Sequence, residues 1–219
     1  MAVAFKIDLR HRDVASRPEV NSRCPIAGLI LAGGASRRMG TPKALLRFQD
    51  ETFLDRLIRL FSAVASPVIV ALGHQSGQIR AGIQRSAEAT FAVNPDPERG
   101  MLSSLQCGLK ALPAGTEAVM FTPVDHPNLQ AATLEKLAGL FENERAPVIV
   151  PTYQGEHGHP VCIARAVAQE LLALPAGAMA SDVIHKYVDR TSYIDVDDPA
   201  VTTDVDDPEA YAGLLRQRP

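Results

Sequence analysis

The chain has few cysteines, no long apolar stretch and no secretory signal, and each absence argues against a class of protein. Its three cysteines, Cys24, Cys107 and Cys162, are scattered singly, which argues against a disulfide framework and a zinc cluster. The longest apolar stretch, Ile26–Ala32, is far shorter than the roughly 20 residues that a membrane helix needs. The first residues alternate charged and apolar side chains, unlike a secretory signal.

An excess of positive charge is also missing. The 22 Lys and Arg residues against 25 Asp and Glu residues give a net charge of −3, and no basic run is long enough to follow a phosphate backbone, so nucleic acid is not an expected partner. Hydrophobic residues make up 46% of the 219 positions, which suits one globular domain with a buried core. We expect residues 1–22 to form a flexible leader and 23–219 a single domain of a cytoplasmic protein.

Short apolar runs alternate with segments in which apolar residues recur at helical spacing. Buried strands are expected at Ile26–Ala32, Val68–Leu72, 91–94, 118–124 and 148–150, and helices around 53–64, 102–112, 134–141, 167–174 and 182–188. The alternation predicts an α/β fold with a mostly parallel sheet covered on both faces, and ligands at the carboxyl ends of its strands. The glycine-containing segment 155–163 is expected to form a hairpin.

The segment 31–43, Leu-Ala-Gly-Gly-Ala-Ser-Arg-Arg-Met-Gly-Thr-Pro-Lys, has the chemistry of a phosphate-binding loop. Its three glycines allow positive φ and close approach of a ligand, and successive backbone N–H groups in such a turn attract anions. Arg37, Arg38 and Lys43 add positive charge. The spacing matches neither the P-loop nor the dinucleotide-binding fingerprint. An ordinary strand-to-helix turn is the alternative.

This loop resembles the signature of the MobA-like NTP transferase family, and in particular its molybdenum cofactor cytidylyltransferases and guanylyltransferases. Further blocks follow in the family's order: residues 94–105, Pro123-Val-Asp-His-Pro127, Gly158-His-Pro-Val161 and the closing segment 203–211. The resemblance implies the three-layer nucleotide-diphospho-sugar transferase fold and Mg²⁺ as cofactor. It also implies transfer of CMP or GMP from a nucleoside triphosphate to a phosphorylated acceptor, with release of pyrophosphate.

The resemblance also assigns roles to individual residues. The nucleotide-binding residues it implies are Leu31, Ala32, Gly33, Gly34, Ser36, Arg38, Lys43, Asn94, Gly100, Ser103 and Ser104. Within this set, Arg38 and Lys43 would contact the triphosphate and, together with Asp125, form the catalytic group. Asp125 matches the family's magnesium-binding aspartate, and Asp206 is the second expected metal ligand, with Asp204 as its rival.

The residues themselves support part of this assignment. Asp125 follows an expected strand and has no cation near it in sequence, and Mg²⁺ takes carboxylates together with phosphate oxygens. A helix cap or turn aspartate is the alternative role. The segment Gly100-Met-Leu-Ser-Ser104 predicts a helix N-terminus, with Ser103 or Ser104 as the cap and a donor to an anion. Capping alone is the alternative there.

The resemblance gives mixed indications about the base and names an acceptor. Gly100-Met-Leu-Ser-Ser104 and Gly158-His-Pro160 look like the cytidylyl branch, which often has Ala-Gly and Phe where this chain has Gly33-Gly34 and Met39. CTP is therefore favoured over GTP. The implied acceptor is of the molybdopterin type, and a molybdoenzyme or its chaperone is a further expected partner. The alternatives are a sugar- or polyol-phosphate nucleotidyltransferase and a non-catalytic nucleotide- or cofactor-binding protein.

Overall fold

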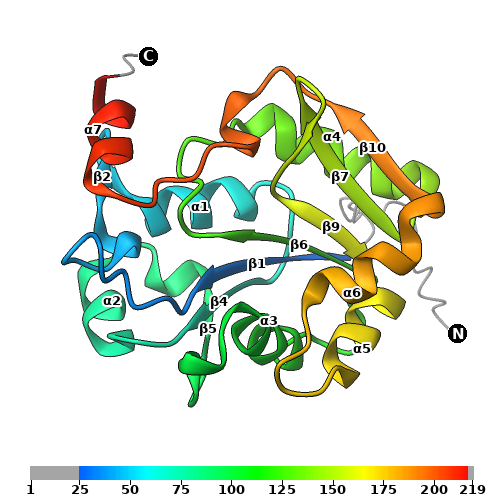
Figure 1. Cartoon of the computed structure of the whole chain (residues 1–219), viewed down its shortest axis with the longest axis horizontal. Helices are drawn as coiled ribbons and strands as arrows, with labels where there is room; N and C mark the ends of the chain where they lie inside the picture. The colour runs from blue at the N-terminus through cyan, green and yellow to red at the C-terminus, as the bar shows by residue number, and fades with distance from the viewer. Residues whose placement is uncertain (1–24, 217–219) are drawn as a thin grey trace, which may run out of the picture.

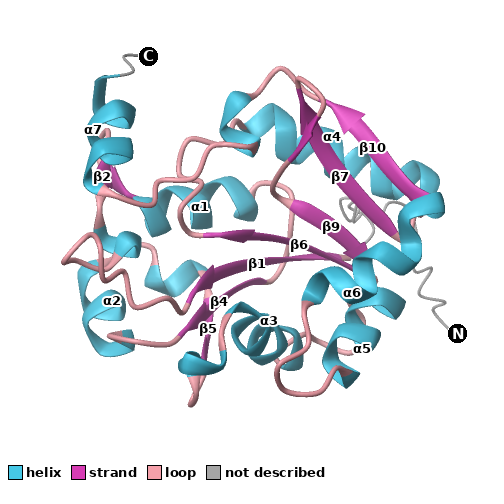
Figure 2. Ribbon diagram, viewed as in Figure 1, coloured by secondary structure: helices cyan, strands magenta, loops and turns pink. Residues whose placement is uncertain are grey.

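A computed structural model describes residues 25–216 as a central sheet with helices on both faces (Figures 1 and 2). The sheet has the order β10-β7-β9-β6-β1-β4-β5, and β8 pairs with β7 outside this path. Its strands are β1 (Ile26–Ala32), β4 (Val68–Leu72), β5 (Thr90–Val93), β6 (Ala118–Pro123), β7 (Val148–Tyr153), β8 (Glu156–His157), β9 (Val161–Ala164) and β10 (Thr191–Asp195). A separate small ribbon pairs β2 (Arg47–Phe48) with β3 (Glu51–Thr52). The predicted leader, 1–22, and Cys24 lie outside the described residues.

The helices join these strands in the predicted alternation. They are α1 (Phe53–Ser62), α2 (Ser76–Gly82), α3 (Met101–Lys110), α4 (Ala131–Glu144), α5 (Arg165–Ala173), α6 (Ala180–Ile184) and α7 (Pro208–Arg216). Short 3₁₀ helices lie between them: η1 (Lys43–Leu45), η2 (Ser86–Glu88), η3 (Pro97–Arg99), η4 (His185–Arg190) and η5 (Pro199–Val201). The helix expected over 182–188 is therefore divided between α6 and η4. Among the described residues, no helix combines the length and the apolar character that crossing a membrane requires.

The strand pairing confirms the predicted α/β fold with a mostly parallel sheet. β1 is parallel to β4 and β6, β4 is parallel to β5, and β7 is parallel to β10. The predicted hairpin over 155–163 is wrong. β8 turns back on β7, whereas β9 inserts antiparallel between β6 and β7. A turn flanked by two extended pieces does not specify which strands those pieces pair with, so the local pattern misled the prediction.

The core forms on both faces of the sheet, because successive strand side chains point in opposite directions. Ile30 belongs to the cluster that includes residues of α1 and α4, and its neighbour Leu29 to the cluster that includes residues of α3 and α5. Both side chains are fully buried. Strands buried on both faces have continuous apolar sequences, which is why the central strands were predictable.

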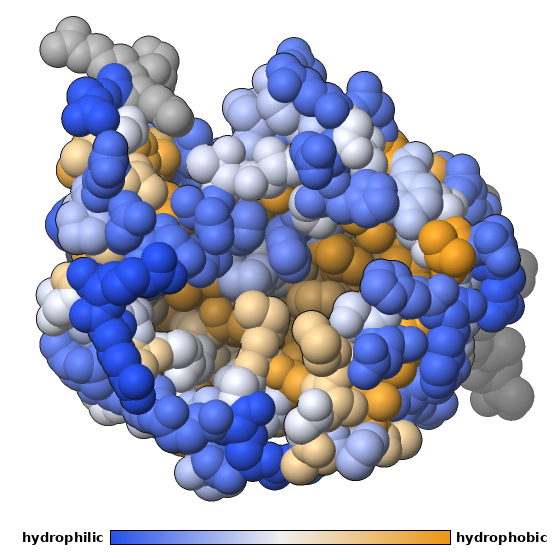
Figure 3. Space-filling view, in the orientation of Figure 1, coloured by the Kyte–Doolittle hydropathy of each residue, from blue (hydrophilic) through white to orange (hydrophobic). Residues whose placement is uncertain are grey.

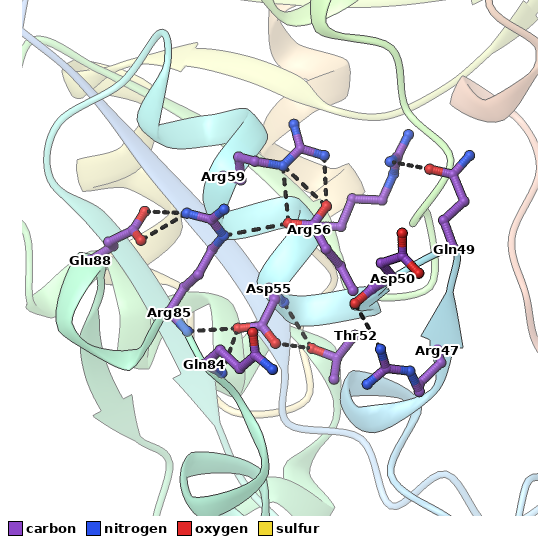
Figure 4. A network of polar contacts seen from close by, with 11 residues as sticks. Arg47, Gln49, Asp50, Thr52, Asp55, Arg56, Arg59, Gln84, Arg85 and Glu88 are labelled. Atoms are coloured by element: carbon purple, nitrogen blue, oxygen red, sulfur yellow. Dashed lines mark hydrogen bonds and ion pairs between the residues drawn. The ribbon is translucent and has the colours of Figure 1, made fainter. Parts of the chain in front are cut away.

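A network of polar contacts fixes the start of α1 (Figure 4). Thr52 is the N-cap, and its hydroxyl accepts the Asp55 N–H at 3.0 Å and donates to the Asp55 carboxylate at 2.7 Å. Asp55 is only 3% exposed, and it also accepts the backbone N–H groups of Gln84 and Arg85 at 2.9 and 2.8 Å. One buried carboxylate thus joins α1 to the chain that follows α2.

We predict that Asp55→Ala lowers the free energy of unfolding by about 2–4 kcal/mol, because two backbone N–H groups lose their acceptor in a poorly hydrated place. Urea denaturation measures the change. Asp50→Ala is the matched control, since Asp50 is exposed and its substitution should cost less than about 0.5 kcal/mol. Equal midpoints for the two variants would contradict the role given to Asp55.

Candidate functional site

The carboxyl ends of three adjacent parallel strands meet at one edge of the sheet. In the register of the sheet, Ala32 of β1 pairs with Leu72 of β4, and Leu31 pairs with Pro123 of β6. The loops after β1, β4 and β6 therefore leave the sheet side by side. The carboxyl edge of an open parallel sheet is where ligands bind in this fold class, so the site is expected here.

A cavity of about 300 Å³, here called the charged cavity, opens at this edge. Most of the predicted nucleotide-binding residues line it, together with Asp125: Leu31, Ala32, Gly33, Gly34, Ser36, Lys43, Gly100 and Ser104. Its lining also includes residues that the sequence did not single out for the site: Pro42, Ala44, Ile79, Pro97, Met101, Pro123 and Val124. These have no chemical signature. Their only signal was position, because most of them lie in or beside the segments that resemble the family: Pro42, Pro97, Met101, Pro123 and Val124.

The loop after β1 is held in place by its own contacts. The backbone N–H of Lys43 donates to the Ser36 hydroxyl at 3.0 Å, which folds the loop back on itself. Gly33 packs so closely on α3 that a Cβ there would lie 2.5 Å from the Ser104 hydroxyl oxygen. Arg37, the first arginine of the loop, forms an exposed ion pair with Glu98 at 3.3 Å. Glycine at position 33 is therefore required by close approach.

Asn94 and Ser103 support the charged cavity from behind and do not line it. The buried Asn94 amide donates to the hydroxyls of Ser103 and Ser104 at 2.8 and 3.2 Å. The prediction that Ser103 or Ser104 caps α3 is wrong, because the N-cap is Gly100. Ser103 stands three residues into the helix, where its hydroxyl donates to the Gly100 carbonyl at 2.8 Å.

An ammonium shared by two carboxylates is the charge centre of the site. Lys43 Nζ donates to Asp125 Oδ2 at 3.0 Å and also to Asp206 Oδ1. Asp206 in turn accepts from Arg38 Nη2 at 2.6 Å. Asp125 therefore has a cation partner, contrary to the expectation from its sequence neighbourhood, and that partner lies 82 residues away. Asp204 instead lines a different cavity, beside α7.

The pKa shifts follow from these contacts. Burial opposes the charge of Lys43, but the hydrogen bonds and charges of Asp206 and Asp125 together outweigh it and raise the pKa of the ammonium above its ordinary value. The hydrogen bond from Lys43 is the main cause that lowers the pKa of Asp206, with a further contribution from Arg38. Lys43 is thus held as a cation and Asp206 as a carboxylate at neutral pH.

The same two aspartates fit a divalent cation. Asp125 and Asp206 reach a single ammonium, so their oxygens converge on one point, and hard cations such as Mg²⁺ take one or two carboxylates together with phosphate oxygens. Within residues 25–216, no group of three His, Cys, Asp or Glu side chains is arranged to hold a metal ion.

Two neighbouring histidines, His126 and His159, extend the contacts of the charge centre beyond Asp125. His126 Nδ1 lies 3.0 Å from the Ala200 carbonyl, and its Nε2 lies 3.9 Å from Asp125 Oδ1. The His159 ring is tilted against it, with centroids 5.1 Å apart. Burial, and then the proximity of His126, lower the pKa of His159 to about 4. The hydrogen bond between His126 and Ala200 also fixes the orientation of the His126 ring. Because the Ala200 carbonyl can only accept, the Nδ1 of His126 carries a proton.

Comparison with known proteins identifies the family of the chain. A family model described as the MobA-like NTP transferase domain matches residues 28–191. The chain is 30% identical over 130 residues to a probable molybdenum cofactor guanylyltransferase of Bacillus cytotoxicus, covering 59% of this chain and 63% of that relative. It is 28% identical over 147 residues to the molybdenum cofactor cytidylyltransferase of Escherichia coli K12, covering 67% and 74%. The match thus spans less than two thirds of the length of the first relative.

Solved structures give a similar result. The Rv0371c protein of Mycobacterium tuberculosis H37Rv superposes with a TM-score of 0.79 at 28% identity, covering 90% of this chain and 100% of that one. A structure of the same protein in complex with manganese has a TM-score of 0.74 at 25% identity, covering 89% and 100%. The family match contains the glycine-rich loop, Lys43, Asp125 and most of the sheet. The chain belongs to the MobA-like NTP transferase family.

Proposed function

We propose that the protein is a nucleotidyltransferase that transfers a nucleoside monophosphate from a nucleoside triphosphate to the phosphate of a molybdopterin-type acceptor. The observation that carries the proposal is the charge centre, in which Lys43 meets Asp125 and Asp206 beside a glycine-rich loop at the carboxyl edge of the sheet. The names of the curated relatives, a cytidylyltransferase and guanylyltransferases of the molybdenum cofactor, support the acceptor class.

In the proposed reaction, an oxygen of the acceptor phosphate attacks the α-phosphorus of the nucleotide. The new P–O bond forms as the bond between the α-phosphorus and the bridging oxygen breaks, and pyrophosphate leaves with the electron pair. A phosphate monoester has its second pKa near 6, so the attacking group is already anionic and needs no general base. Catalysis then consists of positioning and of stabilising charge on the leaving group.

The residues of the loop supply that stabilisation. Lys43 and Arg38 would exchange a carboxylate oxygen for phosphate oxygens when the triphosphate binds, and the loop N–H groups would donate to the same anion. Asp125 and Asp206 would then no longer be paired with Lys43, and their carboxylates would hold Mg²⁺. The bound cation would neutralise charge on the phosphate oxygens. Without ligands, the positive charges of Lys43 and Arg38 balance the two carboxylates.

We also propose CTP as the preferred nucleotide. The support is the resemblance of Gly100-Met-Leu-Ser-Ser104 to the cytidylyl branch, and Gly100, Met101 and Ser104 line the charged cavity. Curated relatives of both base specificities match the chain, so the choice depends on this segment and on Gly158-His-Pro160, which also resembles the cytidylyl branch.

Lys43→Ala should reduce pyrophosphate release by about 100- to 1,000-fold, because a preorganised positive charge next to the leaving group is lost. The assay uses CTP, Mg²⁺ and isolated molybdopterin cofactor as acceptor. Lys110→Ala is the control, since Lys110 is exposed at the end of α3. Unchanged turnover in a folded Lys43→Ala protein would refute the phosphate role.

Asp125→Asn should lower turnover by at least about 100-fold while the fold and some nucleotide affinity remain, because asparagine keeps the shape but loses the charge that a hard dication needs. Asp206→Asn should have the same direction of effect. Asp204→Asn is the matched control and should leave turnover almost unchanged, since Asp204 lines a different cavity. If Asp125 were only a turn or cap residue, asparagine would replace it with full activity.

Thermal denaturation with Mg²⁺ and each of the four nucleoside triphosphates tests the base preference. All four are added at the same concentration, and the nucleotide with the lowest Kd then adds most to the free energy of unfolding, about 2.7 kcal/mol where the concentration is 100 times the Kd. CTP should therefore raise the melting temperature most. A larger shift with GTP would assign the protein to the guanylyl branch.

A further inference from the structure

A second cavity, here called the uncharged cavity, lies among the strands of the C-terminal half of the sheet and has no assigned role. Its volume is about 360 Å³, within the range of small-molecule pockets. It lies among residues of β7, β8, β9, β10, α6 and η4. Figure 3 shows this face of the molecule hollowed, with apolar residues on the floor of the hollow and hydrophilic residues around it.

The lining of this cavity is apolar and aromatic and contains no Asp, Glu, Lys or Arg side chain. Val150, Val161 and Ile184 supply apolar surface, and Val188 is 51% exposed at the cavity. The polar side chains are three histidines and Tyr193. Such a lining disfavours a charged group and favours a neutral one that offers an apolar face and a few hydrogen-bonding atoms.

One wall of the uncharged cavity is a stacked aromatic pair. The rings of His157 and Tyr193 lie 4.6 Å apart with an interplanar angle of 21°. Tyr193 is 45% exposed and also borders the cavity, so part of its ring is accessible to a ligand. Flat aromatic walls bind flat ring systems, because stacking does not depend on the identity of the ring.

The backbone holds this wall rigidly. The His159 N–H donates to the Val201 carbonyl at 2.8 Å, and a Cβ at Gly158 would lie 2.3 Å from that same oxygen. The segment 157–159 is therefore pressed against the chain of η5, and only glycine fits between the two histidines. A preformed wall lowers the ordering cost of binding.

The uncharged cavity is connected to the charge centre by direct contacts. His159 lines the uncharged cavity and lies against His126, whose Nε2 is 3.9 Å from Asp125 Oδ1. Asp125 lines the charged cavity. The two cavities are therefore neighbours, with the side chain of His126 between His159 of one lining and Asp125 of the other.

We infer that the uncharged cavity binds the planar heteroaromatic ring of the acceptor, with Tyr193 and His157 as its stacking wall. This inference rests on the proposed function for the identity of the molecule. It adds the subsite and the residues that would select the acceptor, which are separate from those that bind the nucleotide.

Direct binding of 6-methylpterin to the full chain tests the inference without any need for turnover. Pterin fluorescence is titrated with wild-type protein and with Tyr193→Ala, which should bind about ten-fold more weakly, while Tyr193→Phe keeps the ring and should restore most of the affinity. Val188→Trp, which fills the cavity from an exposed position, should also abolish binding. Val93→Trp is the matched control, because Val93 is 49% exposed on β5 and does not line the cavity.

The nucleotide-induced rise in melting temperature separates the two claims. It should be the same in wild type, Tyr193→Ala and Val188→Trp, because these residues do not line the charged cavity. Absence of pterin binding, or equal affinity in all four variants and wild type, would overturn the inference and leave the proposed transferase chemistry standing. Pterin binding that is lost as expected, with no pyrophosphate release from any nucleotide, would instead refute the proposed function alone.

Discussion

The partly buried ammonium of Lys43 lies between two carboxylates that come from distant parts of the chain. Asp125 follows the central strand β6, and Asp206 lies just before α7, 163 residues after the lysine. Charges partly removed from water are costly unless each has its partner, so the ammonium and the two carboxylates stabilise one another where they meet. The loop after β1, the end of β6 and the segment before α7 must therefore be in place at the same time. The site depends on the whole carboxyl edge of the sheet.

Much of the fold was predictable because its central strands are buried on both faces. β1 and β4 coincide with the predicted strands, and β6 differs from its prediction by one residue at its end. The local sequence pattern did not predict which strands pair with one another. Nothing in 155–163 specifies that β9 enters the sheet between two distant strands. The cap of α3 was wrong because Gly100, at a φ of 87°, begins the helix three residues before Ser103.

The kinds of residue that form the candidate site were predictable from the sequence, but the contacts between them were not. A glycine-rich loop with a lysine, and an aspartate after a strand, have recognisable chemistry, but the contact between Lys43 and Asp206 is tertiary. The residue between Asp204 and Asp206 explains why Asp206, and not Asp204, contacts Lys43. Val205 is buried, and its N–H donates to the Asp125 carbonyl at 2.9 Å, which places Asp206 beside Lys43. The apolar residues that line the two cavities carry no chemical signature of their own in the sequence.

The position of Asp206 has a consequence for how activity can diverge among relatives. It lies after residue 191, where the match to the family model ends. A mutation there would change the number of negative charges facing Lys43 while the glycine-rich loop stayed intact. Selection can therefore adjust the electrostatics of the site from the segment that precedes α7, and a search for altered catalysts confined to the glycine-rich loop would overlook such changes.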